Sequence, residues 1–155
     1  GRLLGSNTSK VIERAKVPVL AIPENVKFDG FGTVVYATET LAADDKSFRK
    51  LLEQLEAFDV KYEVLHVQSS SETDDAAVKE KAAAFEAAVN RENLSVNIRK
   101  SDDVQLAIAD FVKETHAGLL AMVTEERSFL RKVFDPSLTR KMALQAETAL
   151  MVFHI

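Results

Sequence analysis

The sequence contains no cysteine and no tryptophan, and only three prolines and five glycines stand among its 155 residues. Without cysteine, the chain cannot form disulfides, hold an iron–sulfur cluster or use a thiol nucleophile. Its net charge of −4 offers no basic surface that would attract nucleic acid. No apolar run approaches the ~20 residues that a membrane-spanning helix needs, so we expect no membrane contact and a cytoplasmic location. No disulfide therefore stabilises the fold.

Hydrophobic residues make up 46 % of the chain, which is enough for one good core. From Thr33 onward, apolar runs typical of buried strands alternate with the 3.6-residue spacing of amphipathic helices. The predicted strands are 33–37, 62–67, 94–98, 119–123 and 149–155, and the predicted helices carry the faces Phe48 to Phe58, Val78 to Val89, Val104 to Val112 and 137–146. Gly118 is expected to end the third helix. Because parallel strands need helical crossovers, this order predicts a doubly wound, five-stranded parallel α/β sheet.

The first and last segments of the chain are similar to each other. Four residues near the start match four near the end at one constant offset of about a domain length: Ser6, Thr8, Lys10 and Ala15 with Ser137, Thr139, Lys141 and Ala146. We interpret residues 1–24 as the C-terminal helix and strand of a first repeat, and residues 27–155 as a complete second repeat. The first strand remnant is then expected beside the last strand.

Ligands of doubly wound sheets bind beyond the carboxyl ends of the strands. In this chain that edge should gather Glu39, Val67 with Gln68, and the loop 123–137. A candidate site is therefore sought there.

The residues at these strand ends resemble the universal stress protein (UspA-like) family. The resemblance rests on Val34 to Glu39, Leu65-His-Val67, Leu120 to Thr124 and Pro18-Val-Leu20, in that family's order and spacing, and it covers essentially the whole chain. It implies a Rossmann-like sheet, and the similar first segment resembles a tandem-domain member of which this chain is the C-terminal part.

The resemblance also implies where a nucleotide site would lie. Nucleotide-binding members of the family carry an Asp after the first strand and Gly-x2-Gly-x9-Gly-Ser/Thr after the fourth. The corresponding positions here are Glu39, Val123, Glu126, Pro136 and Ser137, so that only Ser137 keeps the family's residue type. Proline has no N–H to offer a phosphate, and side chains fill the space that glycine leaves open. We therefore expect no ATP binding in the usual family manner.

The charged residues near this loop would have opposite effects on the binding of a triphosphate. Glu125 and Glu126 would repel a triphosphate, whereas Arg127, Arg131 and Lys132 would attract it. In the first-repeat remnant, Gly5-Ser6 matches the end of the family motif, so ATP is a possible ligand of a first domain in a longer protein. On this chain itself we expect no cofactor.

Other polar residues have plainer explanations. The three histidines lack the spacing of metal ligands, so no metal is expected. Glu39, Asp44 and Asp45 could form a carboxylate cluster for Mg²⁺ or for acid–base chemistry, but helix capping is the favoured interpretation. Ser137 is interpreted as an N-cap, and no nucleophile elbow is present. Phe129, Leu130, Val133 and Phe134 are read as a short helix over the crevice or a partner-binding lid.

The apolar sequence of the last strand predicts that it pairs with another strand. We expect Val19 to Ile22 to pair antiparallel with Leu150 to Phe153, either within the chain or between two exchanged copies, because the pairing would hide an exposed edge. The apolar face of the helix 8–15, with Val11, Ile12 and Ala15, also needs a cover, which we expect a homodimer to supply.

Three functions remain open. The first is a stress-response regulatory or scaffold domain with a degenerate phosphate loop, which supports dimerisation and acts on an unknown protein client. The second is an ATP-binding module or slow ATPase that uses Glu39, Arg127, Arg131 and Ser137 in a rebuilt site. The third is a small-molecule binder that has kept the crevice. No sequence pattern identifies a catalytic residue.

Overall fold

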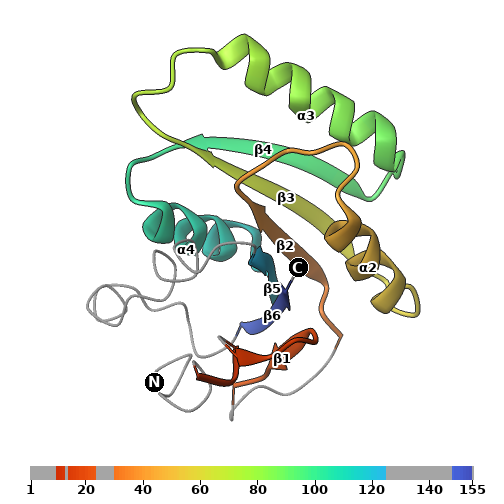
Figure 1. Ribbon diagram of the computed structural model, residues 1–155. Coiled ribbons are helices and arrows are strands. Elements are labelled where there is room, and N and C mark those ends of the chain that lie inside the picture. Colours follow the sequence, from red (N-terminus) through yellow and green to blue (C-terminus); the bar gives the residue numbers. More distant parts are fainter. Residues whose placement is uncertain (1–9, 13, 24–29, 125–147, 155) are drawn as a thin grey trace.

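The computed structural model describes residues 10–12, 14–23, 30–124 and 148–154. Its centre is a six-stranded sheet in the order β1-β6-β5-β2-β3-β4 (Figure 1). The strands are β1 (Val19–Ala21), β2 (Thr33–Thr38), β3 (Lys61–Gln68), β4 (Leu94–Lys100), β5 (Leu119–Thr124) and β6 (Ala149–His154). Strands β2 to β6 run parallel, and β1 alone is antiparallel. The predicted parallel α/β sheet with an added antiparallel strand is confirmed.

Three described helices cross between the strands: α2 (Lys46–Gln54), α3 (Asp75–Val89) and α4 (Val104–Thr115). Each one begins after an aspartate whose carboxylate accepts hydrogen bonds from backbone N–H groups of the first turn: Asp45, Asp74 and Asp103. Such capping satisfies donors that have no intrahelical acceptor. Local sequence therefore fixes where each crossover begins.

Helices cover both faces of the sheet, with α2 and α3 on one face and α4 on the other (Figure 1). On the first face, Phe48 of α2 packs among three other rings, with centroid distances of 4.9 Å to Tyr36, 5.3 Å to Phe85 and 5.8 Å to Tyr62. The second face is mainly aliphatic, with Ile108 of α4 packed over residues such as Leu65. The alternation of side chains along each strand produces these two cores.

The N-terminal segment belongs to the second face. Residues 10–12 and 14 are helical, and Ile12 is only 2 % exposed within the core that α4 also covers. The expectation that a second copy must cover this residue is therefore wrong, because the chain's own sheet covers it. Val11 on the same segment remains 55 % exposed.

Strand β1 pairs with β6 as predicted. Val19, Leu20 and Ala21 lie opposite Val152, Met151 and Leu150 within one chain. The strand ends at Ala21, so Ile22 does not extend the ladder, and β6 now has a neighbour on each side.

Two element boundaries differ from the sequence prediction. Helix α2 ends at Gln54, and Phe58 lies beyond it, 39 % exposed, where its ring meets Phe31 edge-on. Helix α4 ends before Gly118, because His116 takes the left-handed conformation with φ of 52°. Gly118 is needed for space instead, since a Cβ there would collide with the carbonyl oxygen of Phe31.

The predicted helix 137–146 lies outside the described residues.

Candidate functional site

The parallel strands bring their carboxyl ends to one edge of the sheet. After β2 the chain moves to β3 on one side, while β5 occupies the other side of β2. This reversal of direction is the topological switch point at which doubly wound sheets form a binding crevice. Ala37 of β2 lies opposite Met122 of β5, one residue before the end of β2 and two before the end of β5. The candidate site is therefore the edge beyond these residues.

The end of β2 is held by its own polar groups. Thr38 Oγ1 donates to the Thr40 carbonyl oxygen at 2.6 Å and accepts from the Thr40 N–H at 3.1 Å. His66 Nδ1, on neighbouring β3, donates to the Thr38 carbonyl oxygen at 3.2 Å. These bonds use local donors and acceptors and hold the turn that leads out of the crevice.

Asp45 is a cap and not a free acid. Its Oδ1 accepts from the N–H groups of Ser47 and Phe48 at 3.0 Å each, and its Oδ2 accepts from the Tyr36 hydroxyl at 2.8 Å. Burial, together with the nearby Asp45 charge and the hydrogen bond to it, raises the pKa of Tyr36 far above its usual value, so this phenol stays protonated. Asp44 forms an exposed ion pair with Arg49, at 3.8 Å. The capping interpretation is confirmed for Asp45.

The starts of α3 and α4 are occupied in the same way. Asp74 Oδ1 accepts from the Ala77 N–H, and Asp103 Oδ1 accepts from the Leu106 N–H, both at 3.0 Å. A helix N-terminus attracts an anion because its N–H groups and dipole are unsatisfied. At all three described helix starts a carboxylate of the chain already serves as that anion.

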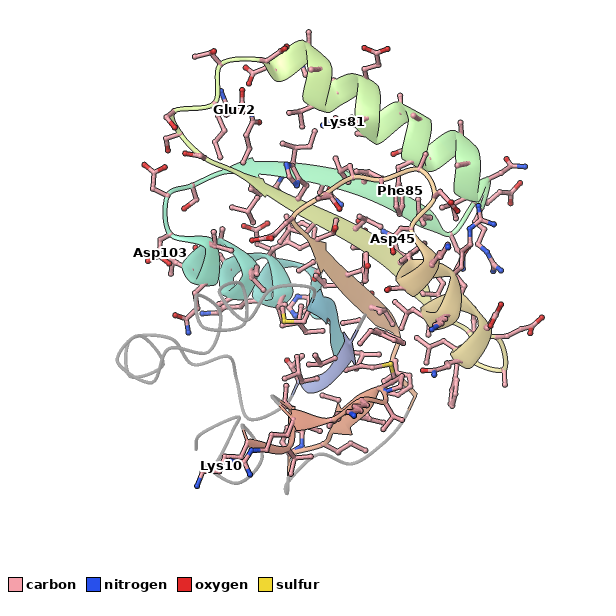
Figure 2. The ribbon with its side chains drawn as sticks, viewed as in Figure 1. Lys10, Asp45, Glu72, Lys81, Phe85 and Asp103 are labelled. Atoms are coloured by element: carbon pink, nitrogen blue, oxygen red, sulfur yellow. The ribbon has the colours of Figure 1, made fainter. Side chains whose placement is uncertain are left out.

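Further polar contacts join the loops at the ends of β3 and β4. Asp75 accepts from Lys100 Nζ at 2.8 Å and from Gln68 Nε2 at 3.2 Å, and the lysine bond above all lowers the pKa of this carboxyl. Asp102 accepts from the Ser70 N–H at 2.9 Å and from Ser69 Oγ at 3.2 Å, and the bonds from Ser70 lower its pKa as well. Figure 2 shows the loop at Glu72 and the start of α4 at Asp103, between which these contacts form.

The structure places two of the six predicted site residues. Glu39 is exposed directly after β2, and Val123 lies in neighbouring β5, so the backbone brings both to the switch point. Glu126, Arg127, Pro136 and Ser137 lie outside the described residues, and so do the apolar residues 129–134. Their roles stay predictions.

Sequence reasoning missed Gln105. This second residue of α4 is 1 % exposed, and neither its amide oxygen nor its amide nitrogen has a hydrogen-bond partner in the described part of the chain. The signal was present, because Gln105 stands three residues before Ile108 and seven before Val112, on the helix face that enters the core.

Metal and membrane functions receive no support from the described residues. Across residues 10–12, 14–23, 30–124 and 148–154, no group of three or more acidic or histidine side chains could hold a metal ion. In the same part of the chain, every helix is too short or too polar to cross a bilayer.

Comparison with known proteins identifies the family. The model of the universal stress protein family matches residues 30–154, which include every described strand except β1. The chain belongs to the universal stress protein family. No curated protein matches it closely enough to add a more specific relative.

Solved universal stress proteins share the fold at low sequence identity. A universal stress protein from Archaeoglobus fulgidus is 19 % identical, with a TM-score of 0.66, over 98 % of this chain and 55 % of that one. A putative universal stress protein from Pseudomonas aeruginosa is 19 % identical, with a TM-score of 0.67, over 99 % and 58 %. The chain thus spans a little more than half the length of these relatives. An Archaeoglobus fulgidus universal stress protein in complex with dAMP is 17 % identical, with a TM-score of 0.52, over 81 % and 98 %.

Proposed function

We propose that this universal stress protein domain is a regulatory or scaffold unit that does not bind ATP in the usual manner of its family. The occupied helix starts carry this proposal, because Asp45, Asp74 and Asp103 already fill the described anion-binding positions at the carboxyl edge. A triphosphate placed there would meet carboxylates where it needs free N–H donors.

The residues after β5 support the same proposal. Val123 stands where nucleotide-binding relatives have the first glycine of the phosphate loop, and it continues the regular ladder opposite Phe153 of β6. Glu126 and Pro136 replace the other two glycines. A loop with these residues has fewer N–H groups and less space for phosphate oxygens.

Calorimetry with ATP, with and without Mg²⁺, tests the proposal. We expect no saturable heat from the natural sequence. A variant carrying Val123→Gly, Glu126→Gly and Pro136→Gly should gain measurable affinity, because it restores the three glycines together. Micromolar binding by the natural sequence would contradict the proposal.

The alternative is an adenine-nucleotide module or slow ATPase. It is favoured by the relative solved with dAMP and by the basic residues Arg127 and Arg131, which could replace glycine N–H groups as phosphate ligands. In that case an Arg127→Ala, Arg131→Ala variant should lose the ATP binding shown by the natural sequence, while Arg49→Ala, at an exposed pair on α2, should not.

We also propose that the domain forms a homodimer, with β1 at the contact. Strand β6 has β5 on one side and β1 on the other, so a second copy cannot add to β6 unless the copies exchange β1. Leu20 and Ile22 on and beside the outer strand are 42 % and 51 % exposed. An exposed apolar edge strand favours edge-to-edge pairing.

Light scattering at increasing concentration tests this association. We expect the mass of a dimer for the natural sequence and of a monomer for Leu20→Lys, Ile22→Lys, with the same thermal stability at low concentration. A dimer in both proteins would point to exchange of β1 and not to edge pairing, and a monomer at all concentrations would exclude a homodimer.

A further inference from the structure

The two outer edges of the sheet differ in length and in protection. The described sheet ends in β1 on one side and in β4 on the other. Strand β1 has three residues, whereas β4 has seven and contains no proline. A long, regular edge strand is a template on which another chain can pair, and proteins usually block such an edge with charges, bulges or proline. Strand β4 therefore needs a protecting group from elsewhere in the chain.

Alternate residues of β4 turn their backbone groups toward this open edge. In a parallel ladder, every second residue of a strand bonds to a given neighbour. The Tyr62 N–H of β3 donates to the Asn93 carbonyl oxygen at 2.8 Å, so the odd-numbered residues of β4 face β3. The even-numbered residues, Val96 among them, therefore present their N–H and carbonyl groups away from the sheet.

A carboxylate from α3 occupies one of these outward groups. Glu86 Oε1 accepts from the Val96 N–H at 3.1 Å, and the Glu86 side chain is otherwise exposed. No lysine or arginine stands three or four residues from Glu86 on α3, so the helix itself gives this charge no partner. A charge-assisted bond to a backbone N–H is stronger than a neutral one. The same carboxylate would repel the carbonyl groups of an incoming strand.

The sequence of β4 is complementary to a second copy of itself. Two identical chains in a closed dimer are related by a two-fold axis, so their β4 edges would pair antiparallel. A pairing centred on Val96 places Leu94 of one copy opposite Ile98 of the other. It also places Glu92, just before the strand, opposite Lys100 at its end. Apolar and opposite-charge pairs across two strands are both favourable, and because Lys100 has an exposed ion pair within its own chain, the charges set orientation more than affinity.

We propose that the outer edge of β4 is an interaction surface for a second copy of this chain, and that Glu86 keeps it closed by occupying the Val96 N–H. While that hydrogen bond is made, association is directed away from β4. When the acceptor is removed, two copies pair through β4 in the antiparallel register described above. This surface lies at the opposite end of the sheet from β1 and does not depend on contacts made there.

The test removes the guarding carboxylate in a chain whose β1 edge is already altered. Glu86→Ala is combined with Leu20→Lys, Ile22→Lys, and the mass is followed by light scattering at increasing concentration. We expect this protein to reach twice the mass of its Leu20→Lys, Ile22→Lys parent, because the Val96 N–H is then free to pair. Glu86→Gln keeps an acceptor oxygen, and Glu80→Ala removes another exposed charge of α3, so both should keep the mass of the parent.

Amide hydrogen exchange locates the new contact. The N–H groups of Leu94 and Ile98 should exchange at least about tenfold more slowly in the associated Glu86→Ala protein than in the same protein after dilution. The buried Leu65 amide is the control for folding and should exchange equally in all variants. An unchanged mass, unchanged exchange at Leu94 and Ile98, or equal association of Glu86→Gln would each overturn the proposal. Failure of the homodimer through β1 would not, because each mass is compared with a parent that lacks the apolar β1 edge.

Discussion

The two faces of the sheet are built differently although one set of strands supplies both. Under α2 and α3 the Phe48 ring contacts three other aromatic rings, and the Tyr36 hydroxyl donates to the cap Asp45. Under α4 the core is mainly aliphatic, the N-terminal segment contributes to it, and Gln105 has no partner among the described residues. The comparison teaches that the polar group buried in the first face has its partner within the chain, whereas the second face keeps a buried amide without one among the described residues.

Matched phenylalanine truncations give the largest expected effect. Phe48→Ala should lower the free energy of unfolding by about 3–5 kcal/mol, because it removes the ring that contacts three others. Phe111→Ala on the second face should cost less, about 3 kcal/mol, since the contact found for its ring in the described part of the chain is a cation–π interaction with the Arg99 guanidinium, 5.2 Å from the ring centroid. Urea denaturation measures both. Equal costs would remove the difference between the faces.

The contribution of the N-terminal segment to the second face gives the next effect. Ile12→Ala should lower the free energy of unfolding by about 2–3 kcal/mol, because its side chain is almost fully buried within the same chain. Val11→Ala is the control, since this neighbour is 55 % exposed and should change stability by less than about 0.5 kcal/mol. If Ile12→Ala changed the free energy of unfolding as little as Val11→Ala does, the N-terminal segment would not pack on the second face of its own chain.

Periodicity was sufficient to predict the order of the elements, because continuous apolar runs and amphipathic spacing alternate clearly from Thr33 onward. It misplaced Phe58, whose spacing continued the pattern of α2 although the helix ends at Gln54. The conformation of His116 could not be read from its residue type, because a left-handed histidine is uncommon. The ends of these helices depend on backbone conformation at individual residues, which the spacing of apolar residues does not predict.

The candidate site was less predictable than the fold. Glu39 and Val123 could be placed at the carboxyl edge from the sequence, because the ends of parallel strands must meet at one edge, and their role in binding stays a prediction. The burial of Gln105 and of Ile12 depends on which residues pack over each face, and this is a property of the three-dimensional structure. An unpartnered amide can be recognised only after every neighbour has been located.

Removing a helix cap should cost less than removing a core ring, and the cost should differ between α2 and α3. Asp45→Ala removes the oxygen that accepts from two backbone N–H groups and leaves the buried Tyr36 hydroxyl without its partner, so we expect a loss of about 2 kcal/mol. Asp74→Ala removes one acceptor at an exposed helix start and should cost about 0.5–1 kcal/mol. In a Tyr36→Phe background the cost of Asp45→Ala should fall toward that of a simple cap. An unchanged cost would mean that the tyrosine bond contributes nothing.

The smallest expected effect is the pH dependence of stability that comes from two carboxyls in the loops before α3 and α4. Asp102 and Asp75 have pKa values below the usual 3.8, because Ser70 and Lys100 respectively favour their charged forms. A depressed folded-state pKa stabilises the protein above the unfolded value, and the contribution disappears as the pH falls below about 4 and through the folded pKa. Both carboxyls are exposed, so solvent screening keeps the effect small. We expect the melting temperatures of the natural protein and of Asp102→Asn to differ slightly at pH 6 and to converge near pH 2. A difference that persisted at pH 2 would show that Asp102 acts through something other than its charge, and the link between the loops before α3 and α4 would then have to be a neutral hydrogen bond.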